Sequence, residues 1–122
     1  MFKLENLELA TDDIHFINKS STALDCVAKT WFKKDDQIAI CTPLYPGFLS
    51  DLTRNGSKVL LMKNDDNMSL LEKALEAKEK GAAGFLVCNP ENPTGRVYEK
   101  KEIEAVCKWA DEHKSFYLIF DE

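Results

Sequence analysis

The chain has 122 residues, of which 44% are apolar and 30% are charged, and its net charge is −5. This length suffices for one compact domain with a buried core. The acidic balance argues against nucleic acid and anionic membranes as partners, because both attract basic surfaces. The sequence has no apolar run of about 18 residues, as a membrane span would need, and its polar start does not resemble a signal peptide. We therefore expect a cytoplasmic protein.

Four cysteines are spread along the chain without a C-x-x-C pair: Cys26, Cys41, Cys88 and Cys107. Each has apolar neighbours, so we interpret all four as reduced residues of the core. The two histidines lie at no ligand-like spacing from them, and we expect no metal site.

Short apolar runs alternate with amphipathic stretches along the chain. The runs predict strands near 13–18, 37–41, 58–62, 85–88 and 116–120. A first helix, capped by Ser20 or Ser21, has an apolar face at positions 24, 27, 28 and 31. A short helix follows over 48–54, another begins at a capping box of Ser69 and Glu72 and ends near Gly81, and the last covers 99–113.

This alternation predicts an α/β fold of three layers, with a mainly parallel sheet between two layers of helices. Binding sites in such sheets form at the carboxyl ends of the strands. The loops of interest therefore follow Asn18, Cys41, Cys88 and Phe120.

The most specific motif is NPENPTG at 89–95, directly after a predicted strand. Its two prolines prevent both helix and ladder formation, so the loop is stiff and holds Asn92 in a fixed place. A rigid connection without a binding role is the simpler interpretation of stiffness alone. Six specified residues in a stretch of seven favour a function instead.

The motif resembles the signature of the class I/II aminotransferases, which are fold-type I pyridoxal-phosphate enzymes of amino acid metabolism. Further segments resemble the family in the same order: TPLYPGF at 42–48, FDE at 120–122, and the strand, phosphate loop and helix start at 18–28. The segment at 42–48 is most similar to the 1-aminocyclopropane-1-carboxylate synthase-like branch. The resemblance implies that residues 1–122 are part of the large, cofactor-binding domain, without the small domain.

The resemblance also implies a role for individual residues toward pyridoxal 5′-phosphate. Asp121 would pair with the ring nitrogen and keep it protonated. Asn92 would donate a hydrogen bond to the phenolic oxygen, and Tyr45 would stack on the ring. Ser20 and Ser21 would bind the phosphate at the start of the first helix. The phosphate loop departs from the family, since 19–22 contains no glycine.

None of the 14 lysines matches the position of the lysine that forms the Schiff base in this family. Neither of the two arginines, Arg54 and Arg96, matches the position of the family's arginine that binds the substrate carboxylate. We therefore expect a fragment that is inactive alone, from a homodimeric enzyme acting on an amino acid and a 2-oxo acid. The alternatives are a lyase like 1-aminocyclopropane-1-carboxylate synthase, or a truncated βαβ module without catalytic activity.

Overall fold

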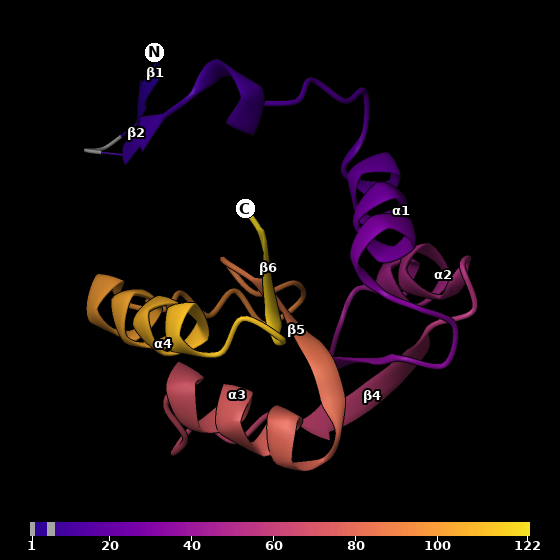
Figure 1. Cartoon of the computed structure of the whole chain (residues 1–122). Helices are drawn as coiled ribbons and strands as arrows, with labels where there is room; N and C mark the ends of the chain where they lie inside the picture. Colours follow the sequence, from indigo (N-terminus) through magenta and orange to yellow (C-terminus); the bar gives the residue numbers. More distant parts are fainter. Residues whose placement is uncertain (1, 5–6) are drawn as a thin grey trace.

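The computed structural model describes residues 2–4 and 7–122, which form a four-stranded sheet with helices on both faces (Figure 1). All neighbouring strands of this sheet are parallel, in the order β4-β3-β5-β6. Its strands are β3 (Gln37–Thr42), β4 (Lys58–Lys63), β5 (Ala82–Cys88) and β6 (Tyr117–Asp121). The helices are α1 (Ser20–Trp31), α2 (Gly47–Thr53), α3 (Leu70–Glu79) and α4 (Lys100–Glu112). The predicted fold class is confirmed.

Two separate apolar cores hold the three layers together. One core joins α3 and α4 to one face of the sheet, through residues such as Ala74, Val106 and Phe85. The other joins α1 and α2 to the opposite face, through residues such as Leu24 and Leu52. Figure 1 shows the two pairs of helices on opposite sides of the strands. The central strands β3 and β5 are continuous apolar runs because both of their faces are covered by helices.

The start of α3 is formed by the capping box that the sequence predicts. The backbone N–H of Ser69 donates to Glu72 Oε2 at 2.7 Å, and the backbone N–H of Glu72 donates to Ser69 Oγ at 3.3 Å. The two bonds satisfy amide groups that have no partner within the helix.

The predicted strand at 13–18 is wrong. The chain begins with a two-stranded antiparallel pair, β1 (Phe2–Leu4) and β2 (Leu7–Leu9), and a 3₁₀ turn, η1 (Thr11–Asp13). Residues 14–19 then run to α1 without joining a ladder. Phe16 is 93% exposed and Ile17 is 43% exposed. Apolar composition alone does not make a strand, because its backbone groups need the partners that a neighbouring strand supplies.

The prediction that all four cysteines belong to the core is also wrong. All four are free thiols, but Cys26 and Cys107 are exposed, while Cys41 and Cys88 are partly buried. In α1 the buried residues are Leu24 and Ala28, so Cys26 points to another face of the helix. None of the helices in the described part of the chain has the length and apolar character needed to span a bilayer.

Candidate functional site

The motif loop at 89–95 and Asp121 lie at the same edge of the sheet. The loop follows β5, Asp121 ends β6, and these neighbouring strands pair Cys88 with Asp121. The backbone N–H of Asn89 donates to the carbonyl oxygen of Asp121 at 2.9 Å, which continues the ladder by one bond. The carboxyl ends of the parallel strands thus bring together residues that are about thirty positions apart in the sequence.

Cys88 lies between Asn92 and Asp121. Its Sγ is 3.7 Å from Asp121 Oδ2 and 3.2 Å from the carbonyl oxygen of Pro90. Burial raises the pKa of the Cys88 thiol, while a hydrogen bond from the backbone N–H of Asn92 acts in the opposite direction. A neutral thiol is a weak donor, so Asp121 keeps acceptor capacity for a stronger partner.

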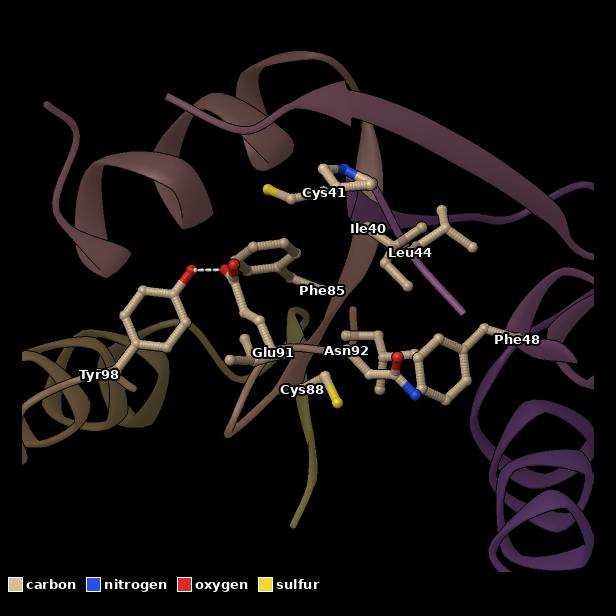
Figure 2. Close-up of a pocket in the computed structure, with 12 residues that line it drawn as sticks. Ile40, Cys41, Leu44, Phe48, Phe85, Cys88, Glu91, Asn92 and Tyr98 are labelled. Atoms are coloured by element: carbon tan, nitrogen blue, oxygen red, sulfur yellow. Dashed lines mark hydrogen bonds between the residues drawn. The ribbon is translucent and has the colours of Figure 1, made fainter. Parts of the chain in front are cut away.

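Asn92 and Tyr45 both reach the surface, in the loops that follow β5 and β3. Asn92 is exposed, and Tyr45 is 50% exposed in the loop after β3. The ring of Tyr45 meets the buried ring of Phe48 edge-on, with 5.5 Å between the centroids. Figure 2 shows Phe48 and Asn92 among the residues that line the space under the loop. Both candidate residues are therefore accessible to a ligand on the open surface.

The first turn of α1 differs from the predicted one. The N-cap is Lys19, in an extended conformation and without a side-chain cap, so Ser20 and Ser21 are the first two helical residues. The predicted serine cap is therefore wrong. This arrangement favours the binding of an anion, because no capping side chain accepts a hydrogen bond from the first backbone N–H groups of α1. In Figure 1 this turn and the end of β6 both point toward the upper side of the view.

The partly open space beneath the motif loop is too small for a cofactor. Its volume is about 20 Å³, and its lining includes Ile40, Cys41, Phe85 and Asn92 (Figure 2). A space of this size holds roughly one water molecule. A planar cofactor would therefore lie on the open face of the loop and not under it.

The underside of the loop holds a polar cluster that the sequence analysis missed. Lys73 of α3 is 1% exposed, and its Nζ donates to Asn64 Oδ1 and, at 3.2 Å, to Tyr98 Oη. Asn64 and Tyr98 both donate in turn to the carboxylate of Glu91, at 3.1 and 2.5 Å. A signal was present, since Lys73 occupies the apolar face of α3 that Leu70, Ala74 and Ala77 define at helical spacing.

Burial shifts the pKa values of three side chains in and beside this cluster. It lowers the pKa of the Lys73 ammonium group, because the charged form loses its hydration. Burial and then the hydrogen bond to Glu91 raise the pKa of Tyr98. Burial raises the pKa of the Cys41 thiol from 9.0 to about 11, against the opposing charge of Lys73. At neutral pH Tyr98 is therefore a hydroxyl donor and Cys41 a neutral thiol.

Comparison with known proteins finds one family along the whole chain. The sequence model described as "Aminotransferase class I and II" matches residues 1–122. Similar proteins include the asparagine–oxo-acid transaminase of Streptococcus mutans, with 33% identity over 70% of this chain and 23% of that protein. The 1-aminocyclopropane-1-carboxylate synthase 3 of Solanum lycopersicum is 33% identical over 84% of this chain and 23% of the relative. The chain is thus as similar to a transaminase as to a synthase, and the predicted similarity to the synthase branch does not distinguish the two groups.

The fold is also found in solved structures. An aminotransferase from Mycobacterium tuberculosis superposes with a TM-score of 0.83 and 25% identity, over 97% of this chain and 32% of that chain. The chain thus spans between 23% and 32% of the length of these three proteins.

Proposed function

Since this chain belongs to the class I and II aminotransferase family, we propose that it forms part of the cofactor-binding domain of a pyridoxal-phosphate-dependent aminotransferase. The reaction is the transfer of an amino group between an amino acid and a 2-oxo acid. Relatives in this family bind pyridoxal 5′-phosphate. The observation that carries the proposal is the meeting of the motif loop with Asp121 at the carboxyl edge of β5 and β6.

The donors and acceptors at this edge fit the chemistry of the cofactor. The bound cofactor acts as an electron sink when its ring nitrogen is protonated. Asp121 supplies the carboxylate that favours the protonated nitrogen, and within the described residues the Cys88 thiol is the one partner of its Oδ2. Asn92 presents an exposed carboxamide as donor to the phenolic oxygen, and Tyr45 presents a half-exposed ring for stacking.

The phosphate group is assigned to the first turn of α1. Ser20 and Ser21 offer hydroxyl groups there, beside backbone amides that α1 itself cannot pair. The positive end of the helix dipole adds to this preference for an anion. An amide cradle of this kind does not require glycine, so the missing glycine in 19–22 does not exclude it.

The covalent lysine is assigned to a part of the enzyme outside these residues. Lys73 is enclosed under the loop and hydrogen-bonded, so its Nζ does not face the open surface. The amino acid, the 2-oxo acid and a second subunit of a homodimer belong to the same proposal. The similarity to a 1-aminocyclopropane-1-carboxylate synthase supports a lyase of that type as second candidate.

Pyridoxamine 5′-phosphate is a suitable probe, because it has an amine in place of the aldehyde and cannot form imines with surface lysines. We expect it to perturb the amide resonances of Ser20, Ser21, Asn92 and Asp121 in an NMR titration of the 122-residue chain. Pyridoxamine without phosphate should lose the perturbation at the two serines. Perturbations confined to other parts of the chain would contradict the proposed site.

Substitution tests the charge at the end of β6. Asp121→Asn keeps the shape but removes the charge that favours the protonated ring nitrogen, and each pKa unit of that preference corresponds to about a tenfold change in affinity. We expect the affinity for pyridoxamine 5′-phosphate to fall about tenfold or more. Asp111→Asn is the matched control, since its side chain is 81% exposed and forms a surface ion pair with Lys114. Equal affinity of the two variants would show that Asp121 is an ordinary carboxylate of a strand end.

A further inference from the structure

Lys73 is a charged side chain in a place where charge is costly. Its side chain lies in the core between α3 and the sheet, with 1% of its surface exposed. A buried ammonium group destabilises a fold unless polar partners replace its water. The ammonium group of Lys73 has two such partners, Asn64 after β4 and Tyr98 before α4.

Both partners also donate a hydrogen bond to the carboxylate of Glu91 in the motif loop. Tyr98 Oη accepts from Lys73 and donates to Glu91 Oε1, as Figure 2 shows for the second bond. Asn64 accepts from Lys73 through Oδ1 and donates to Glu91 Oε2 through Nδ2. Lys73 and Glu91 are thus connected through two neutral bridges, and the positive charge is balanced by the negative charge of the loop.

Glu91 fixes the backbone on both sides of Asn92. Its N–H donates to the carbonyl oxygen of Arg96, and its carbonyl oxygen accepts from the N–H of Gly95, both at 2.7 Å. Thr94 Oγ1 donates to Glu91 Oε2 at 2.8 Å. The residue directly before Asn92 is therefore held through its main chain and its side chain, while Asn92 itself stays exposed.

We propose that Lys73 is a positioning residue, which holds Glu91 through Asn64 and Tyr98 and so keeps the motif loop in the conformation that presents Asn92. The role toward the cofactor rests on the proposed function. Lys73 touches neither cofactor nor substrate in this role. It acts on Asn92 through the loop, and it requires a negative charge at Glu91.

Amide hydrogen exchange of the 122-residue chain tests the proposal without any cofactor. Lys73→Met keeps the unbranched side chain and removes the ammonium group. We expect the amides of Glu91 and Gly95 to exchange about tenfold faster or more, the effect of losing a hydrogen-bonded charge. Amides of the buried strand β3 should keep their rates. Lys80→Met, which removes an exposed lysine paired with Glu76, is the control and should change neither set.

A second substitution separates positioning from simple packing. In Lys73→Met the carboxylate of Glu91 has lost its balancing charge, and Glu91→Gln in the same chain removes that unbalanced charge. We expect the double variant to regain slow exchange in the loop. Tyr98→Phe keeps the buried ring and breaks one bridge, so it should also accelerate the loop amides, even where Lys73→Met fails to fold.

Two results would overturn the proposal. One is a uniform acceleration in loop and strands, which would make Lys73 a general packing residue. The other is additive effects of the two substitutions, which would show that the lysine and Glu91 are not coupled. The titration with pyridoxamine 5′-phosphate adds the cofactor readout: Lys73→Met should weaken the perturbation at Asn92 and keep that at Ser20. If the wild-type chain gives no perturbation, the proposed function and the cofactor role of Lys73 fail together, and the exchange result still decides whether Lys73 orders the loop.

Discussion

Replacing Cys41 with alanine should change how the stability of this domain depends on alkaline pH. Cys41 lies at the end of β3, in the lining of the space under the motif loop, and it is partly buried. Burial raises the pKa of its thiol from 9.0 to about 11, although the charge of Lys73 acts against this shift. The thiol therefore stays protonated in the folded chain at pH values where it ionises in the unfolded chain.

The sign of the effect follows from proton binding. Below pH 9 both states hold the proton, and the stabilisation from the neutral thiol is fully present. As the pH rises toward 11, the unfolded chain loses the proton first, so the free energy of unfolding falls. The fall is about 1.4 kcal/mol for each pH unit and about 2.7 kcal/mol over the whole interval. Cys41→Ala lacks this contribution, so its stability should fall less steeply over the same interval.

Urea unfolding between pH 8 and pH 11, in the presence of a reductant, measures this difference. Titrating groups that do not interact with Cys41 contribute equally to both chains and cancel. Lys73 and Tyr98, whose pKa values Cys41 influences, contribute to the difference together with the thiol. Ile40→Val, the neighbouring position on β3, is a suitable control, because it lowers stability by about 0.5–1.5 kcal/mol at every pH. Its slope should match the wild type. Equal slopes for the wild type and Cys41→Ala would refute the reasoning and show that this thiol ionises in place.

Two further predictions concern the strand before the motif loop and the lysines. Gly84→Ala should destabilise the fold by roughly 1–3 kcal/mol in urea unfolding, because a Cβ there would lie 2.6 Å from Phe32 Cζ and 2.9 Å from the carbonyl oxygen of Tyr117. In the control Gly81→Ala, the new Cβ meets no atom within 4 Å, and the substitution strains only the backbone, whose φ is +87°. If Gly81→Ala lowered the free energy of unfolding more than Gly84→Ala, the packing argument would be contradicted. Borohydride reduction with pyridoxal 5′-phosphate should label no single lysine stoichiometrically, since Lys73 is enclosed; one fully labelled lysine in a peptide map would refute this.

The sheet could be predicted from the sequence because its central strands, β3 and β5, are mostly buried and all four strands are apolar runs. The runs at 37–41 and 58–62 each extend by one residue in the structure, to Thr42 and Lys63. β5 begins at Ala82, before the predicted 85, because small residues continue a strand without adding an apolar signal. The run at 13–18 has the same apolar character and forms no strand in the described chain. A strand depends on a neighbour, and sequence periodicity carries no information about that neighbour.

The candidate site was predictable only in part. The loops after Cys88 and Phe120 were singled out because both directly follow apolar runs, and the family resemblance pointed to Asp121. Their meeting at one edge of the sheet follows from parallel order. The network under the loop was not found, because its members come from three separate segments, namely the loop after β4, helix α3 and the connection from β5 to α4, and only Lys73 has a local signal. Asn64, Glu91 and Tyr98 look like ordinary loop residues in the sequence, and their function in the network depends on tertiary contacts.

Two different kinds of interaction hold the two sides of this site. Asp121 is placed by backbone hydrogen bonds, first by the ladder of β5 and β6 and then by the N–H of Asn89. Asn92 is placed by a loop whose anchor is the side chain of Glu91, and this anchor depends on buried charge. Substitutions in the network should therefore move Asn92 and leave Asp121 in place. If the proposed site is correct, a rigid planar cofactor would have to match the distance between the two, and that distance would accordingly depend on the buried network around Lys73.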